Sequence, residues 1–428
     1  MSRNVVIAQS GGPSPVINSS LLGIIEACAD QPDDFGKIFG AWHGIEGVLK
    51  EELLDLSAQD PAEMRLLGTT PAAGAIGTCR YKLRDQYPAD FERIVEVFRA
   101  HDVGFFFYIG GNDSMDTADK ISRWAGAAGL DMVAVGVPKT IDNDVGDSAF
   151  QLIDHTPGYG SAARFWACCI QNANEENAGA CTSDPVLVLQ IMGRKIGFIP
   201  AAARLADPQR AMPLQIYLPE SGLTLDDLTD NVADELRRSG RCIVAISEGF
   251  EVGDLGAARD AFGHIEYDAC RTSVQQVVVN HLNAARLPAR GFARGQNPGT
   301  DQRSSMLCAS PVDLAEARAV GRHAVTIART AGSGWMATIL RNPGAEYNVR
   351  YDQVPLRAVA NSEREFPAHW LARSRMDVTD DFVRYARPLI GDTMVQVPME
   401  NGLPRFARLR PVFAVRRCAD YLPAAHGV

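Results

Sequence analysis

The sequence has no Cys-x-x-Cys pair, no apolar run long enough to span a membrane and no recognisable leader segment. Its nine cysteines are scattered, apart from the adjacent Cys168 and Cys169, which is typical of reduced thiols rather than of a disulfide framework. The opening stretch, MSRNVVIAQSGG, lacks the apolar core of a signal peptide, and no apolar run approaches the length of a transmembrane helix. We therefore expect a soluble cytoplasmic protein.

Positive charge is also in short supply. The chain has 42 lysines and arginines against 52 aspartates and glutamates, a net charge of −10. This balance argues against nucleic acid or an anionic membrane surface as the main partner. It does not exclude an anionic small molecule, because a local cluster of arginines can overrule the net charge. The 428 residues, 46% hydrophobic and 22% charged, predict an ordinary globular protein with two lobes.

Short apolar runs alternate with stretches of helical periodicity. The apolar runs lie at 4–9, 103–109, 132–138, 186–192 and 242–247, and the helical patterns include 90–101, 267–285 and 313–330. Continuous apolar strands between helices predict an α/β fold with mainly parallel sheets, in two similar three-layer lobes. We expect the chain after Trp335 to form strand pairs and helices that wrap the lobes.

The chemically distinctive segments all follow predicted strands. They are SGG (10–12), GGNDS (110–114), PKTIDND (138–144), MGR (192–194) and SEG (247–249). Because open parallel sheets bind ligands at the carboxyl ends of their strands, we expect a ligand site there.

The two glycine turns, SGG and GGNDS, favour a phosphate ligand. Glycine lets the backbone approach an oxyanion, and a helix that begins at Ser114 or Asp116 would add unpaired N–H donors. A single Gly-Gly turn is more often only a tight turn, but two in one sheet favour phosphate binding.

PKTIDND adds reactive groups. A carboxylate after a buried strand can act as general base on a hydroxyl, and a lysine can stabilise a transferring phosphoryl group. A sugar phosphate could be held by Arg194, Arg294 and Arg303, although a single arginine is more often a solvated side chain. Glu248 could accept hydrogen bonds from sugar hydroxyls, or could simply be a carboxylate at the start of a helix. Together they predict a phosphotransferase acting on a phosphorylated polyol or sugar.

With these motifs assembled, the chain resembles the phosphofructokinase family. The resemblance is carried, in order, by SGGPSPVINS, TCR (78–80), GGNDS, PKTIDND, MGR, SEG and GTDQR (299–303). It implies two similar α/β lobes, an active site in the cleft between them, Mg²⁺ as cofactor and phosphoryl transfer to the 1-hydroxyl of fructose 6-phosphate. The lobes are expected at 1–155, completed by part of 310–345, for the phosphoryl donor and at 156–309 for the sugar phosphate, with 346–428 as the wrapping segment.

The resemblance also implies roles for matched positions. Asp142 is similar to the family's catalytic base, with Lys139 and Asp113 beside the transferring phosphates. Implied donor contacts are Gly11, Gly12, Arg80, Gly111, Ser114 and Lys139. Implied sugar contacts are Thr140, Ile141, Asp142, Met192, Gly193, Arg194, Glu248, Arg294 and Arg303. In the family one of the last two arginines comes from a neighbouring subunit, which implies a homodimer or homotetramer.

Two positions indicate the phosphoryl donor. ATP-using members have glycine where this chain has Asp113 and Lys139. The Asp113 carboxylate would occupy and repel the region of a nucleotide α-phosphate, whereas Lys139 adds a cation beside the transferring phosphates. The chain thus resembles the pyrophosphate-dependent branch. Two alternative functions keep the same fold but change a substrate, with ATP as donor or sedoheptulose 7-phosphate as acceptor. Two further alternatives change the class of protein: an NAD kinase, or a catalytically silent sugar-phosphate sensor.

Three positions depart from the family pattern. Asn112 replaces the aspartate that serves magnesium, so the metal is expected on Asn112 together with Asp113, Asp144 or pyrophosphate itself. Thr300 replaces a histidine, and Pro185 replaces a phosphate-binding arginine supplied across subunits. The effector-site arginines of the ATP enzymes have no counterpart that can be placed here, so we expect little allosteric control.

Overall fold

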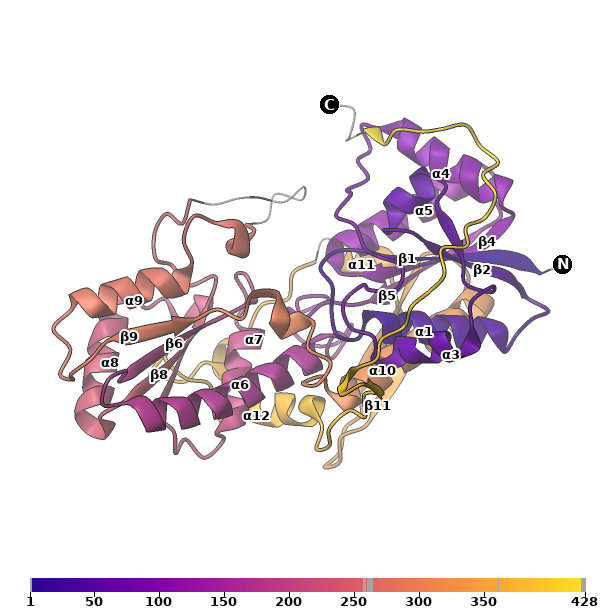
Figure 1. Cartoon of the computed structure of the whole chain (residues 1–428). Coiled ribbons are helices and arrows are strands. Elements are labelled where there is room, and N and C mark those ends of the chain that lie inside the picture. The colour runs from indigo at the N-terminus through magenta and orange to yellow at the C-terminus, as the bar shows by residue number, and fades with distance from the viewer. Residues whose placement is uncertain (1, 257–258, 260–264, 361, 425–428) are drawn as a thin grey trace. The chain divides into compact units, whose positions relative to one another are not determined.

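The computed structural model describes residues 2–256, 259, 265–360 and 362–424, and the chain divides into two units (Figure 1). Unit 1 contains Met1–Gly158, Pro311–Arg364 and Val395–Val428, and unit 2 contains Tyr159–Ser310 and Glu365–Met394. The chain beyond residue 345 thus contributes to both units. That one lobe binds the phosphoryl donor and the other binds the sugar phosphate stays a prediction.

Unit 1 is built on a seven-stranded sheet with the order β11-β10-β5-β4-β1-β2-β3. The pairings among β1, β2, β4, β5 and β10 are parallel, whereas β3 and β11 run antiparallel at the two edges. The strands are β1 (Arg3–Gln9), β2 (Phe35–Ala41), β3 (Leu53–Asp55), β4 (Val103–Gly110), β5 (Val133–Pro138), β10 (Trp335–Arg341) and β11 (Val349–Pro355), and a separate hairpin is formed by β12 (Met399–Glu400) and β13 (Leu403–Pro404).

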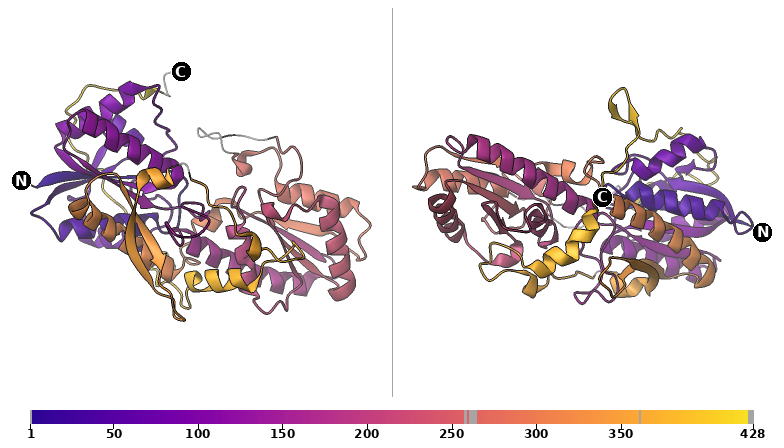
Figure 2. Two further views of the ribbon diagram at one scale, coloured as in Figure 1. Left: turned by 180° about the vertical axis from the view of Figure 1, so that it is seen from behind. Right: turned by 90° about the horizontal axis from the view of Figure 1, so that it is seen from below.

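Helices cover both faces of this sheet. On one face α1 and α10 lie side by side over the alternate strand residues Val5, Ile7 and Phe107 (Figures 1 and 2). On the other face α4 and α5 pack over Val6 and Phe106. The helices of unit 1 are α1 (Ile17–Ala29), α2 (Ile45–Leu49), α3 (Pro61–Leu66), α4 (Pro88–Ala100), α5 (Asn112–Ala127), α10 (Pro311–Thr330) and α11 (Leu356–Val359), with a 3₁₀ turn η1 (Leu67–Thr69). Burial on both faces explains the continuous apolar strands.

Unit 2 has a four-stranded, fully parallel sheet with the order β7-β8-β6-β9. Its strands are β6 (Val186–Ile191), β7 (Leu214–Tyr217), β8 (Cys242–Ser247) and β9 (Ala293–Gln296). Its helices are α6 (Tyr159–Ala180), α7 (Phe198–Ala201), α8 (Leu225–Ser239), α9 (Val274–Ala284) and α12 (Asp380–Ala386), with 3₁₀ turns η2 (Ala202–Ala206), η3 (Pro219–Ser221), η4 (Tyr267–Ala269), η5 (Gly299–Arg303), η6 (Ala368–Trp370) and η7 (Arg387–Ile390).

The predicted α/β class with mainly parallel sheets is confirmed. The predicted single helix at 267–285 is wrong: η4 ends at Ala269, and α9 begins after Ser273, whose hydroxyl caps it by accepting from Gln276 N. All nine cysteines are free thiols. Among the residues that the structure describes, none of the helices combines the length and apolarity needed to cross a bilayer.

Candidate functional site

The turn after β1 is shaped by a glycine and by a neighbouring segment. Gly11 has φ +76°, a conformation that favours glycine. Its N–H donates to Cys79 O at 3.0 Å, and the Thr78 hydroxyl donates to Gly11 O at 2.9 Å. Ser10 and Cys79 also form a parallel bridge. The TCR segment therefore lies directly beside the SGG turn, which places Arg80 at this strand end.

Lys139 ties the turn after β1 to the end of β5. Its side chain is buried, and Nζ donates to Ser10 O at 2.8 Å and to Gly12 O at 2.6 Å. Since β4 lies between β1 and β5 in the sheet, the lysine crosses the carboxyl end of β4. The SGG, GGNDS and PKTIDND segments thus meet at one edge, as the sequence predicted.

The GGNDS segment opens α5 earlier than expected. The helix begins at Asn112 with Gly111 as N-cap, so the prediction of Ser114 or Asp116 as the cap is wrong. Ser114 is instead buried inside the first turn, and a Cβ at Gly110 would lie 2.1 Å from its Oγ. The early start places the N-terminus of α5 next to the glycine pair, where backbone N–H groups can hold an oxyanion.

Asp113 has a partner that the sequence did not indicate. Its Oδ1 lies 3.2 Å from Lys82 Nζ, and both side chains are about one-third exposed. Lys82 comes two residues after Arg80, so a second cation belongs to the TCR side of the site. The only local signal for it was its position just beyond the TCR motif.

Asn112 carries a buried oxygen that the described residues leave unpaired. Its amide Nδ2 donates to Asp144 Oδ2 at 3.3 Å, whereas its Oδ1 has no hydrogen-bond partner in the part of the chain that the structure describes. A buried carbonyl oxygen beside a carboxylate suits a hard cation. No cluster of three or more His, Cys, Asp or Glu side chains that could hold a metal occurs among the described residues. A cation at Asn112 would therefore need further oxygens from a bound small molecule or from water.

The backbone of the PKTIDND loop is held by its own threonine. Asp142 N–H donates to the Thr140 hydroxyl at 3.1 Å, and Thr140 N–H donates to Pro157 O at 3.1 Å. Ile141 is buried, whereas Asp142 is partly exposed. The loop therefore leaves Asp142 partly accessible to solvent and keeps the neighbouring apolar side chain inside unit 1.

In unit 2, Glu248 supports the MGR turn. Its Oε1 accepts from Gly193 N at 3.2 Å and from Arg194 N at 2.9 Å. Gly193 has φ +133°, and a Cβ at Gly249 would lie only 1.7 Å from Arg194 O. The two segments fit closely because glycines occur at both contacts, and Glu248 is 5% exposed.

Gln302 links the MGR turn to η5 and was missed by sequence reasoning. Its Oε1 accepts from Met192 N at 2.9 Å and from Trp166 Nε1 at 2.8 Å, and its amide donates to Gly299 O. The arrangement fixes the segment that carries Arg303. The position of Gln302 inside the GTDQR motif was a signal in the sequence, but only Arg303 of that motif was assigned a role.

Arg294 lies apart from these sugar-site candidates. It pairs in register with Leu187 near the start of β6, whereas Met192 follows the end of that strand. Its guanidinium is 64% exposed and lies 2.7 Å from Asp184. Within its own unit, Arg294 is therefore directed away from the MGR turn.

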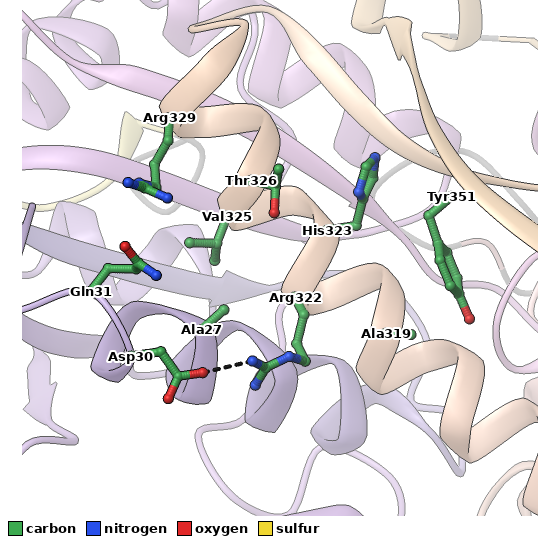
Figure 3. A pocket seen from close by; sticks show the side chains of 10 residues that line it. All are labelled: Ala27, Asp30, Gln31, Ala319, Arg322, His323, Val325, Thr326, Arg329 and Tyr351. Carbon is green, nitrogen blue, oxygen red and sulfur yellow. Dashed lines mark hydrogen bonds and ion pairs between the residues drawn. The ribbon is translucent and has the colours of Figure 1, made fainter.

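A pocket of about 350 Å³ lies elsewhere in unit 1, between the end of α1, the second half of α10 and β11 (Figure 3). Its arginines are already paired: Arg322 with Asp30 at 2.6 Å and Arg329 with Asp34 at 2.7 Å. Helices between parallel strands run opposite to them, so the end of α1 lies away from the strand ends that carry the glycine turns. This pocket is not the predicted site.

A buried histidine supports the segment behind the PKTIDND loop. His155 lies 2.9 Å from Asp154 and 2.8 Å from Glu316, and these carboxylates also contact Arg341 and Tyr347. Burial alone would lower the His155 pKa, but the charges of Glu316 and Asp154 and the hydrogen bonds to them raise it to about 9.

This raised pKa predicts a pH-dependent stability. A histidine whose pKa rises on folding stabilises fully below its unfolded value of 6.5, and the contribution is lost as the pH rises through about 9. We expect about 3 kcal/mol of the unfolding free energy to disappear between pH 6 and 9.5. Urea unfolding of wild type and His155→Gln across this range measures it, with the exposed His369→Gln as control. Equal pH slopes in wild type and His155→Gln would contradict the assignment.

Glycine turns, a helix N-terminus and a buried lysine at the strand ends of a parallel sheet are typical of α/β phosphotransferases. A family model described as Phosphofructokinase matches residues 4–343. The chain belongs to the phosphofructokinase family.

The chain is similar to known proteins over nearly its whole length. It is 36% identical over 429 residues to the pyrophosphate–fructose 6-phosphate 1-phosphotransferase of Halomonas elongata, covering 98% of this chain and 99% of that protein. It is 37% identical to the protein of the same name from Xanthomonas campestris pv. campestris, with 99% of each covered. The crystal structure of the pyrophosphate-dependent phosphofructokinase from Marinobacter aquaeolei is 34% identical, with a TM-score of 0.88, and the match covers 98% of this chain and 100% of that one.

Proposed function

We propose that the protein transfers a phosphoryl group reversibly from pyrophosphate to the 1-hydroxyl of fructose 6-phosphate, giving fructose 1,6-bisphosphate and phosphate. The observation that carries the proposal is the Lys139 ammonium, 2.8 and 2.6 Å from the carbonyl oxygens of the SGG turn. A cation in that place suits a compact, highly charged donor. The names of the similar proteins support the same donor and acceptor.

The proposed roles are those that the family resemblance implies, and the local contacts described above within each unit support them. Pyrophosphate binds the backbone of Gly11, Gly12 and Gly111 and the first turn of α5, with Arg80, Ser114 and Lys139 completing the donor site. Fructose 6-phosphate binds Thr140, Ile141, Asp142, Met192, Gly193, Arg194, Glu248 and Arg303. Glu248 serves the sugar by holding the MGR backbone and through its own carboxylate.

The reaction then needs one proton transfer and one displacement. Asp142 accepts the proton of the 1-hydroxyl as the oxygen attacks the nearer phosphorus. The bond from that phosphorus to the bridging oxygen breaks, and the second phosphate leaves. Lys139 and the N–H groups of α5 stabilise the charge on the phosphoryl oxygens, because they are already in place before the reaction. Asp113, held by Lys82, occupies space that a nucleotide would need.

Mg²⁺ is proposed as the cofactor. The unpaired Asn112 Oδ1 and the neighbouring Asp144 carboxylate are the residues that would hold it. A magnesium ion commonly takes one or two protein oxygens and completes its shell with water and substrate phosphates. Bound there, it would neutralise phosphate charge.

A homodimer or homotetramer in the cytoplasm is also proposed. The orientation of Arg294, away from the MGR turn of its own unit, supports a role for this arginine at the sugar phosphate of a neighbouring copy. Nine free cysteines suit a reducing compartment.

The donor assignment is tested by initial rates with fructose 6-phosphate and Mg²⁺. We expect pyrophosphate to exceed ATP by at least about 100-fold in kcat/KM, because Asp113 repels the α-phosphate and Lys139 favours pyrophosphate. In the double variant Asp113→Gly/Lys139→Gly, kcat/KM for pyrophosphate should fall. The ratio of kcat/KM for pyrophosphate to kcat/KM for ATP should therefore become smaller. A wild type that prefers ATP would overturn the donor assignment, and a protein that binds the sugar but turns over neither donor would be a sensor.

A further inference from the structure

Arg364 is a fully buried cation that the proposed reaction does not use. It lies beyond α11 and its relative exposure is 0%. Burying a guanidinium costs several kcal/mol unless hydrogen bonds replace its water. Its partners therefore show what the chain gains from this residue.

Arg364 donates hydrogen bonds to the segment that follows Asp142. Nε donates to Asp147 O at 3.0 Å, Nη1 donates to Asp154 O at 2.9 Å, and Nη2 donates to Ile153 O. The backbone N–H of Arg364 donates to Asp144 O at 2.8 Å. One arginine thus joins both ends of the loop, 144–154, to each other.

Further contacts show that the loop is shaped around the guanidinium. Nη1 also lies 3.4 Å from Asn143 Oδ1, which accepts from Thr156 N at 3.0 Å. The guanidinium lies over the Phe150 ring, with Arg364 Cζ 4.3 Å from the ring centroid. A Cβ at Gly146, which has φ +102°, would lie 3.2 Å from Nη2.

The chain is held by tertiary contacts on both sides of Asp142. On one side Thr140 forms a bridge with Gly158. On the other side Asn143 and Asp144 are tied to Arg364. We propose that Arg364 is a positioning residue, which holds the backbone of residues 143–144 so that the Asp142 carboxylate is correctly placed to take the proton of the sugar hydroxyl. This inference rests on the proposed function of Asp142.

Neither lysine nor methionine can reproduce these contacts. Lysine keeps the charge, but its donors share one nitrogen and cannot occupy the three separate positions from which Nε, Nη1 and Nη2 donate. Methionine has a similar length without charge or donors. Because a displacement of about 1 Å in a reacting group can cost about 10²-fold in rate, we expect kcat to fall by about 10²-fold in both variants. KM for fructose 6-phosphate should stay within about threefold, since Asp142 placement affects the transition state more than sugar binding.

A double-mutant cycle separates positioning from general stabilisation. Steady-state rates with pyrophosphate, fructose 6-phosphate and Mg²⁺ are measured for wild type, Asp142→Asn, Arg364→Lys and the double variant, with thermal unfolding recorded for each. If Arg364 acts through the Asp142 carboxylate, the double variant should match Asp142→Asn within about threefold. The matched control is Arg123→Lys, whose exposed guanidinium pairs with Asp119 on α5.

The outcomes are distinguishable. Losses that multiply in the double variant, an unchanged kcat in Arg364→Lys, or a loss accounted for by the unfolded fraction at the assay temperature would each overturn the positioning role. Arg364→Met, measured in the same way, keeps the test available if one variant folds poorly. A wild type without pyrophosphate activity would overturn the proposed function and this inference with it. An Asp142→Asn variant with full activity would overturn the role of Asp142 as base, and hence this inference, but not the proposed reaction.

Discussion

Replacing Asp142 by asparagine should lower kcat by about 10²–10⁴-fold, because the amide cannot accept the proton of the sugar hydroxyl. The change keeps the hydrogen bond from the Asp142 backbone N–H to the Thr140 hydroxyl, because that bond does not use the substituted side chain. KM for fructose 6-phosphate should therefore change little. Initial rates at saturating pyrophosphate, together with binding of fructose 6-phosphate by calorimetry, measure the two effects separately.

The matched control for this substitution is Asp131→Asn, which removes the same charge from a fully exposed carboxylate in unit 1. Its kcat should equal that of wild type. An Asp142→Asn variant that turns over as fast as the control would show that another group, or solvent, takes the proton. A variant that no longer binds the sugar would assign Asp142 to binding instead.

Replacing Lys139 by methionine should reduce kcat/KM for pyrophosphate by about 10²–10³-fold, the usual cost of removing one preorganised charge or donor. The substitution removes a cation from the proposed pyrophosphate site and also releases the Ser10 and Gly12 carbonyl oxygens. Both effects weaken the donor side of the reaction, so KM for fructose 6-phosphate should change by less than about threefold. Initial rates with each substrate varied in turn measure this difference.

Lys37→Met is the matched control, because Lys37 is 64% exposed and pairs with Asp55 in unit 1. Equal losses for both substrates would indicate that Lys139 supports the sheet edge as a whole. Unchanged pyrophosphate kinetics in a folded Lys139→Met protein would remove the lysine from the donor site and, with it, the main argument for the proposed donor.

The parts of the site that sequence reasoning predicted are local. Gly11, the glycine pair at 110–111 and Lys139 each follow an apolar run directly, and strands of a parallel sheet present their carboxyl ends at one edge. Helix boundaries were less certain, because several neighbouring polar residues can act as caps. At 110–116 the helix begins at Asn112, and at 267–285 Ser273 starts a new helix.

The sequence by itself determined the α/β class, the family and the strand ends that carry the charged loops, because apolar periodicity and motif order are properties of neighbouring residues. Only the tertiary structure decided which side chains support those loops. Lys82 contacts Asp113, Gln302 contacts Met192, and the loop after Asp142 encloses Arg364, through contacts between residues far apart in the chain. Such contacts depend on how elements pack, and a buried arginine or glutamine leaves no periodic signal in the sequence.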